Sequence, residues 1–383
     1  MSSTARNSRV LWLFLMASLT FFTCSENVTN PDKNTIPEYG LIYFPAGGGG
    51  ESPMIELTFS SKNGQVIDTT LSNCYYYSME FTDDGAMAIY VGGYAVPPEQ
   101  RNEMAWVVNQ FTGDTLSKYI GWTGIKPVLG PDKSRLLITG AGFMLFDFPS
   151  LNLVHDIVFE PGSNWPIDGG FMTAGNKLFY FCESKDTIFV LDFTNPGSVS
   201  ETAAPISFDG QPVFPTSSLV DYRNEHIILI ATNMSGKKDI VVFGSDDLSF
   251  IKGIHTDHYY SHLVEHPDGN RIFLGAIAAY TVSPDENRID IYDISQNVIN
   301  SFVGVHDIDS MSYFQPDQMV ITPDGGMLYV RATEYYDGSD AFTINWPAVG
   351  IRISDRAPVQ YLNPAVAHST TISVNPIMIS EAD

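Results

Sequence analysis

The sequence predicts an all-β protein in which one four-stranded antiparallel unit repeats around a ring. Three observations lead to this prediction: a hairpin pattern that recurs six times, a second pair of strands between successive hairpins, and the absence of any competing helical pattern. The chain has 383 residues, of which 44% are apolar, 13% aromatic and only 17% charged. This composition excludes a disordered chain and predicts a large core.

Each hairpin is an alternating apolar stretch, a tight turn built on Asp, Gly or Asn, and a second stretch rich in β-branched and aromatic residues. The clearest copy has the turn Thr322-Pro323-Asp324-Gly325, followed by the strand Met327 to Val330. Pro fixes φ at the first turn position, Asp bonds the local backbone and Gly accepts a positive φ. The turns fall at Gly85, Lys133, Gly175, Asn224, Gly269 and Gly325, in steps of 48, 42, 49, 45 and 56 residues.

Between the hairpins lies a second pair of strands, each an apolar stretch, a polar turn and another strand. Examples are Ile55 to Phe59 with Gln65 to Thr69, Met144 to Phe148 with Leu153 to Phe159, Ile188 to Phe193, Ile240 to Phe243 with Phe250 to Ile254, and Ile289 to Ile294 with Val298 to Val303. A hairpin and an outer pair together make a unit of about 48 residues, which is typical of a β-propeller blade. The 343 residues from 39 to 381 divide into seven blades of 49.

Six inner hairpins and seven outer pairs leave one inner strand to be supplied from elsewhere in the chain. Thr371 to Pro376 has the inner-strand pattern, and we expect it to pair with the N-terminal strands around Leu41 to Phe44 and Ile55 to Phe59. Such a closure covers sheet edges that would otherwise invite aggregation. The predicted fold is therefore a seven-bladed β-propeller that the C-terminal strand closes on the N-terminal blade.

The segment from Thr322 to Ala332 resembles the repeat of YVTN-type β-propellers, which are related to the quinoprotein amine dehydrogenase-like and WD40-like propellers. The other five hairpins are weaker copies, so the resemblance spans nearly the whole chain. The ending that names the family reads Tyr329-Val330-Arg331-Ala332 here, and no Trp-Asp dipeptide ends a strand. The resemblance implies the fold and little chemistry, because members range from surface binding proteins to enzymes.

The first 38 residues predict export and attachment to a membrane. Arg6 and Arg9 precede an apolar run from Val10 to Phe22, which is typical of a secretory signal over residues 1–23. Cys24 follows directly, and Leu19 to Cys24 resembles the lipobox of bacterial lipoproteins, which implies lipidation at Cys24 and a tether over 24–38. An ordinary cleaved signal and an anchor helix stay open as alternatives. We expect a cell-envelope protein, an outer-membrane lipoprotein, with a single propeller domain over 39–383 and a lipid anchor as its contact with the membrane.

The net charge and the positions of the cysteines lead to two further expectations. The formal net charge of −24 would repel a phosphate backbone, so we expect no nucleic acid partner. Cys74 and Cys182 lie two repeats apart, and we expect two separate buried thiols instead of a disulfide.

The candidate chemical motifs favour structural explanations, and we predict no cofactor, no metal and no catalytic residue. His255, His258, His262 and His266 cluster within 12 residues. However, Gly253-Ile254-His255 recurs as Gly304-Val305-His306, which indicates a repeat feature, and His266 should lie at the far end of its strand. Asn109 to Leu116 resembles one copy of a quinoprotein Thr-Gly turn, and we interpret it as an outer hairpin turn. Neither Gly-x-Ser-x-Gly nor His-Glu-x-x-His occurs.

The connections within and between blades predict a recognition surface. The loop between the second and third strands of a blade lies on the same side as the connection to the next blade, and we call this side the loop face. Exposed Tyr and Trp beside carboxylates favour a protein or carbohydrate partner there. The expected binding residues are Tyr94, Trp122, Trp165, His258, Tyr259, Tyr260, Tyr280, Tyr335 and Tyr336. The structural alternative is that these side chains fill the ends of the blades and contact no partner.

Three functional hypotheses follow from the sequence. The first is a non-catalytic binding module in the cell envelope. The second is a propeller enzyme, lactonase-like or quinoprotein-like, with a pocket at the mouth of the channel. The third is a scaffold subunit of an envelope assembly, which predicts an extended apolar patch on the outside of two adjacent blades.

Overall fold

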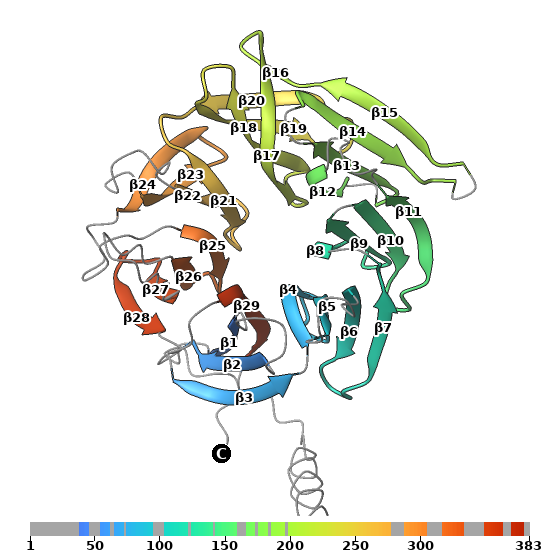
Figure 1. The fold of residues 1–383 in the computed structure, drawn as a ribbon. Helices are drawn as coiled ribbons and strands as arrows, with labels where there is room; N and C mark the ends of the chain where they lie inside the picture. Colours follow the sequence, from blue (N-terminus) through green and yellow to red (C-terminus); the bar gives the residue numbers. More distant parts are fainter. Residues whose placement is uncertain are drawn as a thin grey trace, which may run out of the picture. The chain divides into compact units, whose positions relative to one another are not determined.

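Seven antiparallel sheets stand around a common axis in a computed structural model of the chain (Figure 1). The structure describes residues 38–378 apart from 46–53, 62–64, 73, 95–102, 122–123, 141, 159–165, 173–174, 183–184, 196–197, 277–286, 305–315, 333–347 and 363–368. No helix occurs among these residues, and hence none with the length and apolar content to cross a membrane. The all-β, seven-bladed propeller predicted from the repeat is confirmed.

The strands follow the chain around the ring, and each blade is numbered here from its innermost strand outward. Blade 1 holds β29 (Ser369–Met378), β1 (Tyr39–Pro45), β2 (Met54–Ser60) and β3 (Val66–Ser72). Blade 2 holds β4 (Cys74–Phe81), β5 (Met87–Tyr94), β6 (Glu103–Asn109) and β7 (Thr115–Tyr119). Blade 3 holds β8 (Gly124–Leu129), β9 (Arg135–Gly140), β10 (Gly142–Asp147) and β11 (Leu153–Val158). Blade 4 holds β12 (Pro166–Phe171), β13 (Lys177–Cys182), β14 (Thr187–Asp192) and β15 (Ser200–Pro205).

Blade 5 carries a short extra strand. It holds β16 (Ser207–Phe208), β17 (Gln211–Asp221), β18 (His226–Asn233), β19 (Lys238–Gly244) and β20 (Phe250–His255), with β16 paired to the start of β17. Blade 6 holds β21 (Tyr260–Glu265), β22 (Arg271–Ala276), β23 (Arg288–Asp293) and β24 (Val298–Gly304). Blade 7 holds β25 (Pro316–Ile321), β26 (Met327–Ala332), β27 (Ala348–Arg352) and β28 (Pro358–Leu362).

The C-terminal strand closes the ring as predicted. β29 pairs antiparallel with β1, with Leu41 opposite Val374 and Tyr43 opposite Ile372. The expectation that Ile55 to Phe59 also pairs with the C-terminal strand is wrong. That segment is β2, which lies on the other edge of β1, because a strand has two edges and β29 occupies the first.

The core lies between adjacent blades, and strand alternation divides it into layers. Ile227, Leu229 and Ala231 of β18 pack in the cluster between blades 4 and 5. Ile228 and Ile230 of the same strand pack in the cluster between blades 5 and 6. A strand covered on both faces reads as a continuous apolar run, and each buried aliphatic side chain contributes about 1.5–3 kcal/mol. This explains the apolar runs that follow each predicted turn.

The hairpin turns repeat the same contacts in distant blades. Thr82 Oγ1 accepts a hydrogen bond from the Met87 N–H, and Thr322 Oγ1 accepts one from the Met327 N–H, both at 3.0 Å. Gly85 and Gly325 have φ values of 66° and 71°, the left-handed region that glycine tolerates best. The Asn109 to Leu116 segment is the predicted outer turn between β6 and β7, with Gly113 at φ 74°.

Cysteine and histidine positions agree with the structural interpretations where they are described. Cys182 is a free, buried thiol. His266 lies at the turn end of blade 6, where its Nε2 is 3.1 Å from the Gly325 carbonyl oxygen of blade 7. A Cβ on Gly325 would come within 2.7 Å of that same nitrogen, so the imidazole fills space that only glycine leaves open.

Candidate functional site

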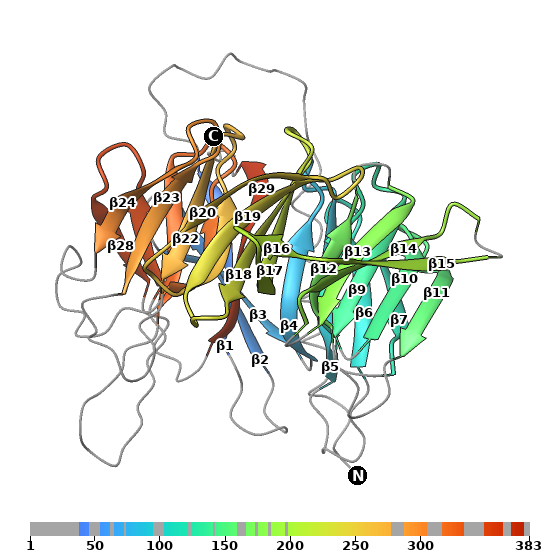
Figure 2. The same ribbon diagram turned by 90° about the horizontal axis from the view of Figure 1, so that it is seen from above.

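The antiparallel topology places the predicted loop face on one side of the ring. In the four-stranded part of every blade, which leaves out β16, the first strand starts, the second ends, the third starts and the fourth ends on this side. The turns between the first and second strands lie on the other side (Figure 2). Six of the predicted binding residues carry no described side chain. Trp122, Trp165, Tyr280, Tyr335 and Tyr336 lie outside the described residues, and Tyr94 ends β5 with only its backbone described.

The other three predicted residues lie together on the connection from blade 5 to blade 6. His258 is partly buried, Tyr259 is 47% exposed and Tyr260 is fully buried at the start of β21. The Thr256 hydroxyl donates to the His258 carbonyl oxygen at 2.9 Å, which holds the connection in a tight bend. Tyr259 therefore presents an aromatic surface, whereas Tyr260 supports the bend from within.

A buried lysine lies against the Tyr259 ring. Lys238 is the first residue of β19 and is only 2% exposed. Its Nζ lies 4.2 Å from the centre of the Tyr259 ring and donates to Thr216 Oγ1 at 3.0 Å. Burial lowers the pKa of Lys238 to about 8, because the charged ammonium loses its hydration. The cation and the ring fix each other in position.

Arg288 joins the same connection to blade 6. Its Nη1 donates to His258 Nε2 at 3.2 Å, so the ring hydrogen of His258 belongs on Nδ1. Its Nε donates to Asp290 Oδ1 at 2.9 Å, and Asp290 Oδ2 accepts the Tyr260 hydroxyl at 2.6 Å. Desolvation and the nearby Asp290 charge both raise the pKa of Tyr260, which stays a neutral donor. His258, Arg288, Asp290 and Tyr260 thus form one hydrogen-bonded chain.

His255 ties the β16–β17 hairpin to the outer part of blade 5. Its Nδ1 lies 2.9 Å from Asp239 Oδ1 and its Nε2 lies 3.0 Å from Asp209 Oδ2. The hydrogen bonds to Asp239 and then Asp209 raise the pKa of His255, because they favour the imidazolium. Among the described residues, no group of three or more His, Cys, Asp and Glu side chains has the arrangement of a metal site.

A second polar set lies on the innermost strands. In six successive blades the pairing of the first two strands shifts register at the same place, as at a β-bulge, so that one residue is skipped. We call the residues directly after these bulges the polar ring. Its members are Ser78, Lys126, Asp168, Ser217, His262 and Gln318.

Asp168 is the best-anchored member of the polar ring. Its Oδ2 accepts the Ser218 N–H at 2.9 Å and the Ser218 hydroxyl at 2.8 Å, and its Oδ1 accepts the Gly169 N–H at 2.9 Å. Lys126 Nζ lies 3.4 Å from Oδ1, with 46% of the lysine side chain exposed. Three neighbouring inner strands are thereby joined. Burial raises the pKa of Glu80 on β4 to about 7, an effect that the Lys126 charge and the Leu129 N–H partly offset.

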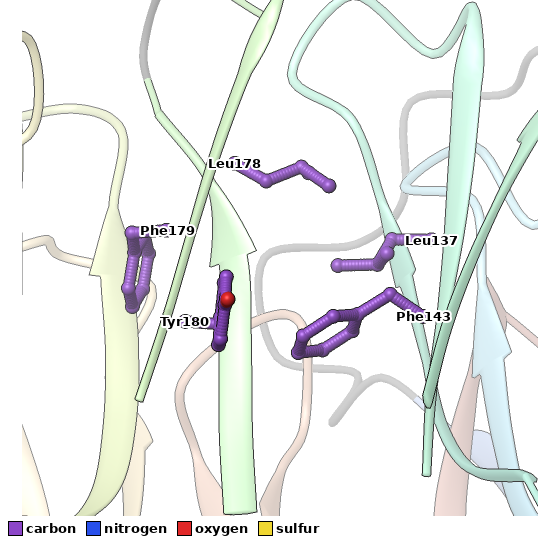
Figure 3. A pocket seen from close by; sticks show the side chains of 5 residues that line it. All are labelled: Leu137, Phe143, Leu178, Phe179 and Tyr180. Atoms are coloured by element: carbon purple, nitrogen blue, oxygen red, sulfur yellow. The ribbon is translucent and has the colours of Figure 1, made fainter. Parts of the chain in front are cut away.

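The small pocket between blades 3 and 4 is lined by apolar and aromatic side chains and includes none of the polar residues described above. Its lining residues are Leu137, Phe143, Leu178, Phe179 and Tyr180. Leu178 and Tyr180 point toward Leu137 and Phe143, whereas the Phe179 ring lies on the other side of β13 (Figure 3). The space between these side chains leaves no room for a water molecule. The Tyr180 hydroxyl donates to Glu201 Oε2 at 2.7 Å. Leu137, Phe143, Leu178 and Tyr180 belong to the packed core between blades 3 and 4.

The sequence placed Tyr259 on the loop face, but it did not indicate the burial of Lys238, the contacts of Arg288 or the polar ring. Lys238 begins an apolar strand, a position at which exposure is the ordinary expectation for lysine. A signal for Asp168 was present, because an acidic residue followed by Gly169-Gly170 is unusual within an inner strand. The bulges leave no such signal, since they depend on pairing between two strands.

Comparisons with known proteins show the fold. No family model matches the sequence, and no curated protein matches it. Among solved structures, a candidate 6-phosphogluconolactonase of Bacteroides fragilis is similar with a TM-score of 0.61 and 14% identity, over 90% of this chain and 99% of that one. The periplasmic gluconolactonase of Pseudomonas aeruginosa is similar with a TM-score of 0.59 and 12% identity, over 88% and 99%.

A propeller that is not named as a lactonase is also similar to this chain. The Cps50 (Swd1) β-propeller domain of Myceliophteria thermophila has a TM-score of 0.58 and 10% identity, over 79% of this chain and 90% of that domain. The chain is therefore a seven-bladed β-propeller. Solved structures that are named as gluconolactonases are among those similar to it.

Proposed function

We propose that this chain is a non-catalytic binding module of the cell envelope that takes its partner on the loop face. The observation that carries the proposal is the Tyr259 ring, which is 47% exposed yet fixed by the buried Lys238 ammonium. An aromatic ring that is ordered before binding loses little conformational entropy when a protein or carbohydrate packs on it. The neighbouring His258 and Arg288 offer polar contacts beside it.

The test compares two exposed tyrosines. Tyr259→Ala removes the loop-face ring, while Tyr119→Ala removes a ring that is 56% exposed on the outer strand β7. Binding of the full-length chain and both variants is measured on a glycan array and in quantitative capture from envelope extracts. We expect Tyr259→Ala to weaken binding about tenfold or more, as for an interface anchor, and Tyr119→Ala to leave it unchanged. Equal loss in both variants, or none in either, rejects the loop face.

Lactone hydrolysis is the second candidate. The observation that favours it is the likeness to gluconolactonase-named propellers over nearly their whole length, together with the Arg288–His258 pair on the loop face. If Arg288 turns from His258 Nε2 to the oxyanion formed at a lactone carbonyl, it stabilises that charge and frees the His258 nitrogen to remove a proton from the attacking water.

A ring-opening assay on glucono-δ-lactone separates the two candidates. If the chain is a lactonase, the full-length protein opens the ring faster than buffer, and both His258→Ala and Arg288→Met lower kcat/KM by about a hundredfold. A rate equal to that of buffer rejects this candidate and leaves the binding module standing.

The proposed setting is the outer membrane, with the propeller held by lipid at Cys24. The support is the sequence pattern of residues 1–38, and multiple acyl chains give firm anchoring. Cys24→Ser should remove metabolic palmitate label and move the protein from the membrane fraction to the soluble one. Retention of label in the variant would reject lipidation at this residue.

A further inference from the structure

Among the residues with a described side chain, the Lys238 ammonium has few partners for a buried charge. Its Nζ has three N–H groups, of which one donates to Thr216 Oγ1. The Tyr259 ring covers a second direction at 4.2 Å. In the part of the chain that the structure describes, no carboxylate lies within 4.0 Å of this nitrogen. Burying an ammonium without a counter-charge raises the free energy of the folded state. An anion bound beside this nitrogen would offset that cost.

The other cations of the same neighbourhood already have carboxylates. Lys237 Nζ lies 3.0 Å from Asp257, Arg288 Nε lies 2.9 Å from Asp290, and His255 lies within 3.0 Å of both Asp209 and Asp239. Each of these positive groups therefore presents little uncompensated charge. Lys238 differs from its neighbours although it lies in a protein of net charge −24, in which acidic partners are abundant.

The fold holds Lys238 in place by two devices. Thr216 is the residue skipped by the β17 bulge between Pro215 and Ser217, and its hydroxyl donates to the Ile230 carbonyl oxygen at 3.3 Å while it accepts from Lys238. Thr256 Oγ1 lies 2.8 Å from the Lys238 carbonyl oxygen and 2.9 Å from the His258 carbonyl oxygen, so its one hydroxyl hydrogen is shared between them, and the Thr256 N–H donates to the Lys238 carbonyl oxygen at 3.1 Å. The amine and its aromatic cover are thus positioned by blade 5 and by the connection to blade 6.

We propose that Lys238 and Tyr259 form an oxyanion-binding site, which takes a carboxylate or phosphate group of a small ligand or of a partner. The proposal rests on the proposed function and names the chemistry of that same face. The anion supplies a counter-charge that the described residues do not give the Lys238 ammonium, and the Tyr259 ring packs on the ligand carbon skeleton. Burial makes such a charge-assisted hydrogen bond stronger than one on the surface.

The test uses D-glucuronate, inorganic phosphate and D-glucose as probes on the full-length chain. With lysines labelled at 13Cε and 15Nζ, the Lys238 signal is assigned by its loss in Lys238→Met and followed during titration by NMR. We expect glucuronate or phosphate, and not glucose, to shift this signal. Lys238→Met should weaken anion binding about tenfold to a hundredfold. Lys237→Met is the matched control, since Lys237 is exposed and paired, and it should change affinity less than about twofold.

The outcomes separate the site from the broader proposal. Binding of glucuronate alone identifies a carboxylate on a sugar, and binding of both anions identifies an oxyanion site of broader range; either supports the inference. Equal binding of glucose, or an unshifted Lys238 signal in the wild-type protein, overturns it. If Tyr259→Ala abolishes partner capture while Lys238→Met does not, the binding face stands and the oxyanion site fails.

Discussion

Asp168 shows how a single acidic residue can hold several strands together. Its carboxylate accepts hydrogen bonds from Gly169 and Ser218 and lies against Lys126, so it joins the inner strands of blades 3, 4 and 5. Removing a buried acceptor leaves each donor without the water it lost on folding, and this cost exceeds the net contribution of the bonds themselves. The same reasoning separates Lys238, which has no carboxylate partner among the described residues, from the paired cations beside it.

Asp168→Ala should lower the free energy of unfolding by about 3 kcal/mol, because the Ser218 and Gly169 donors lose their acceptor and Lys126 loses its ion pair. Urea denaturation followed by tryptophan fluorescence measures the difference. Asp156→Ala is the control, since Asp156 is exposed on the outer strand β11. Equal stability of the two variants would contradict the bridging role of Asp168.

At the scale of strands, glycine sets how closely neighbouring blades approach. Gly275 of β22 faces the start of β25 in blade 7, and a Cβ at this position would lie 2.4 Å from the Pro316 carbonyl oxygen. A backbone oxygen in a paired strand cannot move aside as a flexible side chain can. The contact therefore fixes the spacing of blades 6 and 7.

Gly275→Ala should destabilise the protein by about 1–3 kcal/mol through overpacking. Gly244→Ala is the comparison, because the nearest atoms to its added Cβ, at 2.9 to 3.2 Å, are the side-chain tips of Asp246, Asp247 and Ser249. We expect a smaller loss there, measured as the shift in thermal unfolding midpoint. A larger loss for Gly244→Ala would show that the backbone between blades 6 and 7 yields more readily than the geometry indicates.

At the scale of the whole molecule, the ring depends on its closing strand. β29 is the innermost strand of blade 1 and pairs with β1 across most of its length. It pairs with the edge of β1 that would otherwise have no partner strand, and it contacts β4 and β25 on either side. Closure thus joins the first and last blades into one cooperative unit.

Truncation after residue 368 should remove β29 and convert the protein to an aggregating, partly unfolded form. Truncation after Met378 leaves β29 intact and is the control. Size-exclusion chromatography and thermal unfolding distinguish the two chains. A monomeric, cooperatively unfolding product of the shorter chain would contradict the role given to the closure.

The pH dependence of stability is also a property of the whole molecule. Burial raises the pKa of both Glu80 and Glu265 to about 7. For Glu265, the charges of Asp221 and Asp268 add to the effect and that of Arg223 opposes it. A carboxyl whose folded pKa exceeds its unfolded value stabilises the fold fully below the unfolded pKa, about 4.5, and loses this contribution as pH rises through the folded pKa.

The thermal unfolding midpoint should therefore fall as pH rises from about 4.5 to 7, and the growing repulsion between carboxylates in so acidic a protein acts in the same direction. The double variant Glu80→Gln/Glu265→Gln should show a shallower fall over this window than the wild type. Identical slopes for the two proteins would mean that these carboxyls ionise freely in the folded state.

Much of this architecture could be predicted from the sequence because its causes are local. The turn Thr322 to Gly325 and its copy at Thr82 specify a hairpin through a few neighbouring residues, and the alternation along strands such as β18 specifies two buried faces. The number of blades follows from counting these units. The C-terminal strand was recognisable for the same reason, since its inner-strand pattern had no partner nearby.

The candidate site could be predicted only where it coincided with a loop. Tyr259 was expected on the loop face, whereas the burial of Lys238 depends on Thr216 and Tyr259, which lie 22 and 21 positions away in the sequence. The polar ring likewise depends on bulges between paired strands, and Asp168 meets Ser218 50 residues on.

The sequence by itself therefore determined the repeating unit, the number of blades and the way the ring closes, since each follows from local periodicity and turn chemistry. Only the tertiary structure decided which charges are buried, which are paired and which aromatic ring covers a cation. These properties depend on the distance between side chains from different strands and on the water that packing excludes, and local sequence encodes neither.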